Sequence, residues 1–402
     1  MSLPAVDPAV PRAVRAVYVA FIGSGFAFAS WAARIPQVRD RLGVTPGQLG
    51  LILLCIALGS LVAMPTSGIV IARIGEARTV SSMTFTLTAG LVIAAIGYTI
   101  GVVPVCIGLF LVGLGNGGWD VAMNVQGAAV ERALGRSIMS RFHAGWSVGT
   151  VAGAALGALM ILLHVPVTAH LVATAVVVAL VVPVTVMHGF LPHVVTHEGH
   201  ESRRVALAAW REPRTVLIGL FVLCMAFTEG TGNDWLGIAV IDGYHSSASL
   251  GTFALAVFLA AMTTGRWFGP AILDRFGRVP VLRASSVLAV AGLLLVVFGH
   301  TVGLAFVGAV AWGLGTALGF PTGMSAAADD SHRAAARVSV AASIAYVAFL
   351  AGPPVVGLVG NHVGVLHALV IAVALLGVSA LLCSACAPIK SGEDVRTAEP
   401  IR

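Results

Sequence analysis

Four ionisable side chains stand inside long apolar stretches of the sequence, where their presence needs a reason. They are Asp120, Glu229, Asp234 and Arg266. A charged group near the centre of a bilayer costs about 2.5–3.5 kcal/mol on insertion scales, so such groups pair with one another or line a polar path. We therefore expect these four side chains to face the interior of a helix bundle.

The longest polar stripe surrounds Asp120. Asn116, Asp120 and Asn124 are spaced four residues apart, which places them on one face of a helix. Facing lipid, their amide and carboxylate groups would lack hydrogen-bond partners. The stripe is either a hydrogen-bonded seam between helices or the lining of a solute-binding cavity, and we favour the cavity.

A second polar pair, Glu229 and Asn233, has the same spacing on another apolar stretch and is a second candidate for solute binding. Arg266 is the single base inside the stretches, so it can neutralise only one of Glu229 and Asp120. Glu229 lacks a long amide stripe and is the expected partner of Arg266. Asp120 is then the expected proton carrier, with Glu229 as the alternative.

Charges at the ends of the apolar stretches are candidates for gates. Arg34 ends the first stretch and Asp234 lies in the outer part of the seventh, so we expect the two to pair when the outer mouth is closed. Arg73, Asp274 and Arg275 end the second and eighth stretches on the other side, and Arg266 inside the eighth stretch is a further gate candidate.

Aromatic and imidazole side chains could supply walls that contact a solute. The candidates are Trp31, His143, Trp146, Phe320 and Tyr346. Each of them taken singly is more typical of an interface or packing residue.

The composition identifies the kind of element that positions these residues. Of 402 residues, 58% are hydrophobic and 10% are charged, whereas soluble domains carry about 25% charged residues. This excludes a soluble enzyme and indicates an all-α protein with many membrane spans. The five cysteines lack zinc or disulfide spacing and no phosphate-binding loop is present. We expect no cofactor, no metal ion and no nucleic-acid partner.

Windows of about 20 apolar residues predict twelve transmembrane helices. Their predicted ranges are 14–36, 48–72, 79–99, 103–126, 139–163, 166–187, 215–240, 248–272, 280–300, 302–326, 338–359 and 363–386. The polar segment 188–214 divides them into bundles of six, 1–187 and 215–386, followed by a tail, 387–402. We interpret the first stretch as a span rather than as a cleaved signal peptide.

The distribution of basic residues predicts the orientation. Of the 23 Lys and Arg residues, 19 fall on the side of the N-terminus, 3 fall on the other side, and Arg266 lies within a span. Because basic residues gather in cytoplasmic segments, both termini are predicted to be cytoplasmic.

Similar strings recur about 200 residues apart. Gly113-Leu114-Gly115 matches Gly313-Leu314-Gly315, and Ala72-Arg73-Ile74-Gly75 matches Asp274-Arg275-Phe276-Gly277. With six spans in each half, both halves have the same orientation. This is the parallel repeat of major facilitator transporters.

Two loops carry a family resemblance. Gly68 to Arg78, with Arg73, Gly75 and Arg78, resembles the signature loop of the major facilitator superfamily, G-x3-D-R-x-G-R, and Asp274 to Arg278 resembles it again. Ala72 replaces the expected aspartate in the first copy, and Pro270 replaces the leading glycine in the second. The resemblance implies a twelve-helix transporter of the bacterial inner membrane that works by alternating access.

Four further strings point to a narrower resemblance. Trp31 to Pro36, Asp234-Trp235, Gly319 to Pro321 and Gly352 to Pro354 look like an uncharacterised bacterial branch near the fucose–proton symporters. That group has a protonatable carboxylate on its fourth span, where Asp120 stands here. It also has one on the first span, where this sequence offers only serines.

The sequence therefore predicts a monomeric secondary transporter that couples a small polar solute, such as a sugar, to protons. A proton-driven exporter of drug-like or biosynthetic compounds is the alternative. A transporter-like membrane sensor is a third hypothesis from a different class. Solute, direction and coupling ion are not encoded in any motif that we find.

Overall fold

The computed structural model describes residues 9–135, 138–192, 208–329 and 333–389, which fold into helices connected by short turns. The first half contains α1 (Ala9–Ala32), α2 (Ile35–Leu42), α3 (Pro46–Ile74), α4 (Glu76–Gly97), α5 (Val102–Leu134), α6 (Met139–Leu162) and α7 (Val167–Gly189). The second half contains α9 (Pro213–Tyr244), α10 (Ala248–Phe276), α11 (Arg278–Phe298), α12 (Val302–Thr316), α13 (Gly319–Ala327), α14 (Ala334–Val363), α15 (Val365–Ala368), α16 (Val370–Leu382) and the short 3₁₀ helix η1 (Cys383–Cys386).

Within the described residues, twelve helical segments are long and apolar enough to cross a membrane. Each overlaps one of the twelve predicted ranges, so the predicted number and class of spans are confirmed. Much of the predicted interdomain loop, 193–207, and most of the predicted tail, 390–402, lie outside the described residues.

Two spans are broken by a turn that the hydropathy pattern does not reveal. The first span turns at Ala33 and Arg34 between α1 and α2, and the tenth turns between α12 and α13. Pro36 and Pro321 each lie in the first turn of the helix that follows. Proline suits that position because its missing N–H would have no partner inside the helix.

The reversal between α2 and α3 is fixed by local sequence. Gly43 ends α2 with φ 63°, a left-handed conformation that glycine adopts without steric cost. Thr45 then caps α3: its side chain accepts a hydrogen bond from the Gln48 N–H, and the Gln48 side chain accepts one from the Thr45 N–H. This turn holds the first two spans antiparallel.

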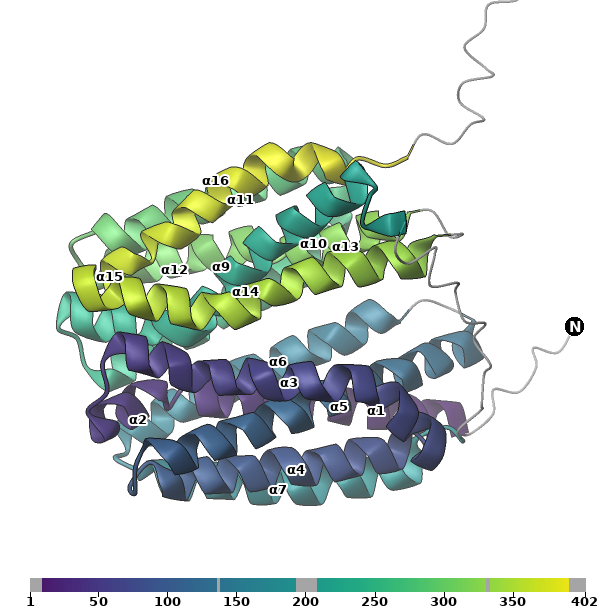
Figure 1. The fold of residues 1–402 in the computed structure, drawn as a ribbon, viewed down its shortest axis with the longest axis horizontal. Helices are drawn as coiled ribbons and strands as arrows, with labels where there is room; N and C mark the ends of the chain where they lie inside the picture. The colour runs from purple at the N-terminus through teal and green to yellow at the C-terminus, as the bar shows by residue number, and fades with distance from the viewer. Residues whose placement is uncertain (1–8, 136–137, 193–207, 330–332, 390–402) are drawn as a thin grey trace, which may run out of the picture.

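The helices form two bundles with the same internal packing, α1 to α7 and α9 to η1 (Figure 1). In the first bundle α1 packs on α6, α3 on α5 and α4 on α5. In the second, α9 packs on α14, α10 on α12 and α11 on α12 in the same manner. The predicted fold class, two six-helix bundles related by a parallel repeat, is confirmed.

Glycines allow the closest helix contacts in both bundles. A methyl group at Gly113 would collide with the Ile56 carbonyl, and a methyl group at Gly313 would collide with the Phe258 carbonyl. In α6, Gly149 lies against the Ile22 carbonyl of α1 in the same way. Glycine at these positions therefore lets the helix backbones approach closely.

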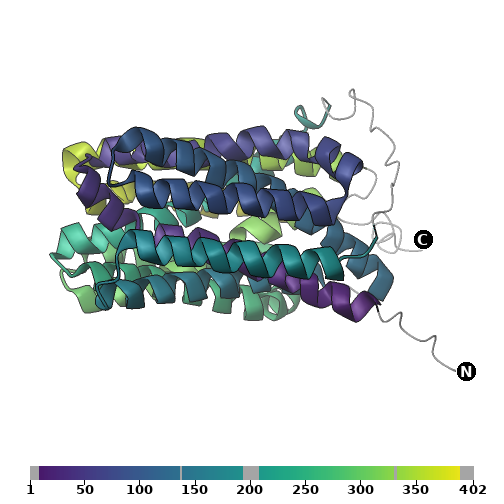
Figure 2. The same ribbon diagram turned by 90° about the horizontal axis from the view of Figure 1, so that it is seen from below.

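The chain enters α1 and leaves η1 at the same end of the molecule, here called the terminal face (Figures 1 and 2). The other end, where α2 and α15 lie, is called the opposite face. The two bundles meet through α3 with α14 and through α6 with α10. In Figure 1 their ribbons approach each other at the opposite face and diverge toward the terminal face.

The contact between α3 and α14 near the opposite face brings backbones together. A methyl group at Gly50 would collide with the Pro353 carbonyl, and one at Gly357 would collide with the Pro46 carbonyl. Bulky side chains cannot enter this crossing, so it fixes how closely the two bundles approach.

Candidate functional site

Asn116, Asp120 and Asn124 of the α5 stripe are all half-buried. Ser24 of α1 donates a hydrogen bond to Asn116 Oδ1 at 3.1 Å. Asn124 Nδ2 donates to the Asp120 backbone oxygen at 2.8 Å and to Asp120 Oδ1 at 3.2 Å. No ion pair joins Asp120 to another residue of the described chain. The stripe thus presents one carboxylate, held by an amide, without a described cation.

Glu229 of α9 and Arg266 of α10 form the ion pair that charge counting favours. Arg266 Nη2 lies 2.8 Å from Glu229 Oε1 and 2.9 Å from Oε2. The Arg266 side chain is only 18% exposed and the Glu229 side chain only 14%. Arg266 also donates to Ser147 Oγ of α6 at 3.4 Å, across the boundary between the bundles. The pair therefore links α9 and α10 to the first bundle at mid-span.

Asn233 and Asp234 follow Glu229 on α9. The Asn233 side chain is 92% buried, with its Oδ1 atom unpaired among the described residues. Asp234 is half-buried and makes no hydrogen bond or ion pair with a described residue. Because Asp234 is five residues from Glu229, it points to a different side of α9 from the Glu229–Arg266 pair.

The predicted pairing of Arg34 with Asp234 is wrong for this structure. Arg34 is 2% exposed and points into the first bundle, where Nε donates to His170 Nδ1 at 3.0 Å and Nη2 donates to the Val165 oxygen at 3.1 Å. Arg34 occupies the turn between α1 and α2, beside the start of α7. Two neutral acceptors therefore satisfy it without a carboxylate, and no contact of Arg34 reaches Asp234.

The ion pair that joins the first and seventh spans lies farther out, between Arg39 and Asp242. Arg39 binds both carboxylate oxygens of Asp242, with an Nη2–Oδ1 distance of 2.9 Å. Beside it, Asn361 Oδ1 of α14 accepts from the Gly47 N–H of α3 at 2.9 Å. Thr252 of α10 also donates to the Ala33 carbonyl at 3.2 Å. These contacts close the opposite face.

Sequence reasoning missed Arg39 and Asp242 although their signal was present. Both lie at the ends of spans that the repeat makes equivalent, one basic and one acidic. Arg34 and Asp234 stand in more apolar surroundings than this exposed pair and were therefore the predicted pair.

The predicted aromatic and imidazole candidates differ in their burial and in their contacts. Tyr346 of α14 donates to the Ala57 carbonyl of α3 at 3.2 Å, so it lies at the boundary between the bundles. His143 is exposed on α6 one turn from Ser147 and contacts the edge of the Phe21 ring.

Trp146 and Phe320 are half-buried, and Trp146 lies against Phe28. Trp31, in contrast, is 1% exposed and belongs to the packed core. The interpretation of Trp31 as a wall that contacts solute is therefore not supported by its burial.

The remaining gate candidates are exposed at the terminal face. Arg73 ends α3, and Asp274 and Arg275 end α10, with the Arg275 guanidinium 5.2 Å from the centre of the Phe276 ring. No described hydrogen bond or ion pair joins any of them to the other bundle. The interbundle polar contacts between described residues lie at mid-span or toward the opposite face.

The fold and this distribution of contacts can be compared with known proteins. A family model described as Major Facilitator Superfamily matches residues 17–336 and 224–399. The chain belongs to the major facilitator superfamily. This membership and the fold make it a facilitator-type transporter that spans the membrane many times.

A relative in Sinorhizobium fredii, the uncharacterized transporter y4wD, is 32% identical to this facilitator over 348 residues, covering 86% of this chain and 91% of the relative. The fold is similar to that of the nucleoside transporter NupG, with a TM-score of 0.74, 15% identity and coverage of 94% and 98% of the two chains. It is also similar to the Escherichia coli fucose:proton symporter FucP, with a TM-score of 0.66, 16% identity and coverage of 94% and 99%. These two likenesses concern the fold.

Proposed function

We propose that this facilitator couples the movement of a small polar, sugar-like solute to protons, with Asp120 as the proton carrier. The observation that carries the proposal is the difference between two acids. Glu229 is held by both oxygens on Arg266, whereas Asp120 stands in a half-buried amide stripe without a described cation. A carboxyl group in such a place can exist protonated as well as ionised.

The amides around Asp120 support a polar solute. Asn116 and Asn124 both donate and accept hydrogen bonds, and hydroxyl groups of a solute would satisfy both functions. NupG and FucP are described as a nucleoside transporter and a fucose:proton symporter. Both kinds of solute contain a sugar ring, which agrees with the chemistry of the stripe.

The terminal face is proposed to be cytoplasmic, since 19 of the 23 basic residues fall on that side. The structure would then be the state in which the outer side is closed by Arg39–Asp242 and its neighbours. Solute would reach Asp120 from the cytoplasmic side in this state and from the outer side after the bundles rock.

The experiment has two steps. Purified protein is screened by thermal unfolding against sugars, nucleosides, organic acids and drug-like cations. The stabilising compound is then tested for counterflow, and for net uptake into proteoliposomes that contain a pH-sensitive dye. We expect a polyhydroxylated compound to stabilise the protein, to show counterflow, and to carry protons in its own direction.

Other outcomes would overturn the proposal. Protons moving opposite to a hydrophobic compound would indicate the exporter. Binding without counterflow would indicate a sensor. Net uptake of a polar solute that is indifferent to a pH gradient would remove the coupling but leave the transporter.

A further inference from the structure

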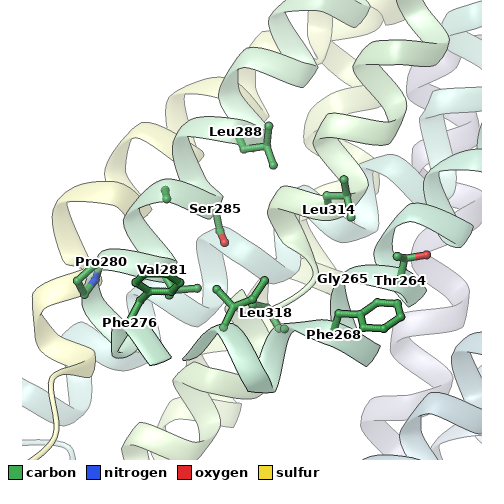
Figure 3. Close-up of a pocket in the computed structure, with 13 residues that line it drawn as sticks. Thr264, Gly265, Phe268, Phe276, Pro280, Val281, Ser285, Leu288, Leu314 and Leu318 are labelled. Atoms are coloured by element: carbon green, nitrogen blue, oxygen red, sulfur yellow. The ribbon is translucent and has the colours of Figure 1, made fainter. Parts of the chain in front are cut away.

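An apolar groove of about 540 Å³ opens on the outer surface of the second bundle (Figure 3). Thr264, Phe268 and Phe276 of α10 form one wall, Ser285 and Leu288 of α11 form the other, and Leu314 of α12 lies at one end. The groove differs in chemical character from the Glu229–Arg266 pair, because none of its lining residues is ionisable. The groove shares no lining residue with the Asn116–Asp120–Asn124 stripe or with the Glu229–Arg266 pair.

The length of the groove along α10 is close to the thickness of one leaflet of the bilayer. From Thr264 to Phe276 the axis of α10 rises by about 18 Å, and half of the hydrocarbon core of a bilayer is about 15 Å thick. Phe276 is the last residue of α10 at the terminal face. The groove therefore runs from the terminal face to about mid-membrane.

A second groove, of about 690 Å³, lies on the other side of α11. The two grooves share Pro280, Ala284 and Leu288, which form a ridge between them. The second groove is lined by α11 alone and is open to the lipid, so one walled groove and one open apolar strip lie on the two sides of the ridge, one for each acyl chain of a phospholipid.

The charge at the mouth of the grooves selects the headgroup. Arg283 lines the second groove, is exposed, and makes no ion pair with a described residue. Arg275 contacts only the Phe276 ring among the contacts described, whereas Arg278 is bound to Asp329 at 2.6 Å. Asp274 is the exposed acid at this end of α10, so two arginines without a described acidic partner outweigh one carboxylate.

The internal repeat shows that the two bundles differ in one side chain at this place. The backbone at Met83 lies against Gly115, and the backbone at Ser285 lies against Gly315 with the same distance of 2.6 Å from the carbonyl oxygen to the added methyl position. Met83 and Ser285 are thus equivalent. The Met83 side chain packs on Gly118 in the first bundle, whereas the short Ser285 side chain faces the groove (Figure 3).

We propose that this double groove binds one anionic diacyl phospholipid from the leaflet at the terminal face, with one acyl chain on each side of the α11 ridge and the phosphate beside Arg283. The shape supplies the place for the acyl chains, and Arg283 with Arg275 supplies the preference for an anionic headgroup. Each such arginine contributes about 1 kcal/mol to the binding of anionic lipid at a membrane surface, a factor of about five.

The test uses full-length protein in mild detergent with dioleoylphosphatidylglycerol or dioleoylphosphatidylcholine. Native mass spectrometry counts the lipids retained, and thermal unfolding measures their effect on stability. Ala284→Phe fills the exposed ridge from the lipid side, and Arg283→Gln removes the charge. The repeat gives Ser82→Phe of α4 as the matched control for Ala284→Phe, and Arg78→Gln removes another exposed arginine of α4.

We expect the wild type to retain one phosphatidylglycerol in preference to phosphatidylcholine and to unfold at a higher temperature with it. Arg283→Gln should weaken this binding about fivefold, Ala284→Phe should abolish it, and both controls should keep it. Equal retention by all four variants, or no preference between the two lipids, would overturn the proposal. A dimer of the chain that dissociates in the two groove variants would show that a second copy occupies the surface instead.

Discussion

Asp120 and Glu229 are both acids within the spans, but their neighbours give them different properties. Glu229 is fixed by Arg266, whereas Asp120 receives one amide hydrogen bond at 3.2 Å. Asp120→Asn keeps the shape and the hydrogen bonds of a protonated carboxyl group. We therefore expect solute exchange to persist while accumulation driven by a proton gradient is lost, as measured by counterflow and by uptake in the same proteoliposomes.

Asp274→Asn is the control for this experiment, because it removes an exposed carboxylate at the terminal face without touching the stripe. It should retain proton-driven accumulation. If Asp120→Asn accumulates solute as the wild type does, Asp120 has a structural role and the carrier must be sought elsewhere.

The Glu229–Arg266 pair should be sensitive to removal of either partner. Glu229→Gln leaves a guanidinium that is largely buried without its counter-ion, which costs about 3 kcal/mol when a buried pair is broken. The double variant Glu229→Gln with Arg266→Gln removes both charges and should recover part of that loss. Thermal unfolding of the two single variants and the double variant measures the coupling, and strictly additive losses would show that no coupling exists.

The residue-scale predictions succeeded where charge balance decides and failed where a neutral partner suffices. One internal base and several acids led to the Arg266–Glu229 contact that the structure contains. The same counting assigned Asp234 to Arg34, but Arg34 is satisfied by His170 and the Val165 carbonyl. Neutral acceptors can meet the hydrogen-bond geometry of an arginine as well as a carboxylate can. The partner of an arginine therefore cannot be deduced from charge alone.

At the scale of the helices, packing of α6 on α1 depends on the absence of a side chain at Gly149. A methyl group there would collide with the Ile22 backbone carbonyl, which cannot move without displacing α1. We expect Gly149→Ala to lower the free energy of unfolding by about 1–3 kcal/mol. Gly377→Ala in α16 is the control, since nothing lies within 4 Å of the added methyl group. Thermal unfolding distinguishes the two, and equal behaviour would contradict the packing argument.

Glu212, just before α9, links that helix to the start of α14. Its carboxylate accepts from Arg337 Nε at 2.6 Å, from Arg333 at 2.9 Å and from Thr215 at 3.0 Å. Hydrogen bonds from Arg337 first, and from Thr215 and Arg333, hold the pKa of Glu212 below its usual value. The folded state therefore favours the ionised form.

The sign of the pH dependence follows from this pKa. The unfolded chain binds a proton on Glu212 at a higher pH than the folded chain does, so this stabilisation is complete above the unfolded pKa and is lost as the pH falls through the folded pKa. Glu212→Gln should be less stable than the wild type at neutral pH, and the difference should shrink toward acid pH. Thermal unfolding between neutral and acid pH measures this. Asp274→Asn, which removes an exposed carboxylate, should show no such convergence.

The elements were the most predictable part of the molecule. Twelve apolar windows gave twelve spans because a bilayer demands a continuous apolar length, and hydropathy measures that length directly. The turns at Arg34 and between α12 and α13 were not predicted. They do not interrupt the apolar composition, and their cause is the backbone effect of Pro36 and Pro321.

For the whole molecule, the contacts at the opposite face should set the balance between its two states. The Arg39 and Asp242 side chains are 12% and 40% exposed, so solvent screens the pair and its contribution is about 1 kcal/mol or less. Asp242→Asn should therefore increase the population that is open at this face by no more than about fivefold. Spin labels on α2 and at the end of α9 would report the distance change.

Exchanging the two charges, with Arg39→Asp and Asp242→Arg, should return the population toward that of the wild type. A double variant that is as open as Asp242→Asn would show that the pair does not hold the face closed. Asp40, which accepts a hydrogen bond from Arg39 in the wild type, is unchanged in every variant.

A rotation at the crossing of α3 and α14 would displace the distant end of α3. Between Gly50, where the backbones touch, and Ile74, where α3 ends, lie 24 residues, or about 36 Å of helix. A lever of that length turns each degree of rotation at the crossing into a displacement of about 0.6 Å at its tip. A side chain added at Gly50 or Gly357 would part the backbones at the crossing and would therefore change the separation of the bundles at the terminal face.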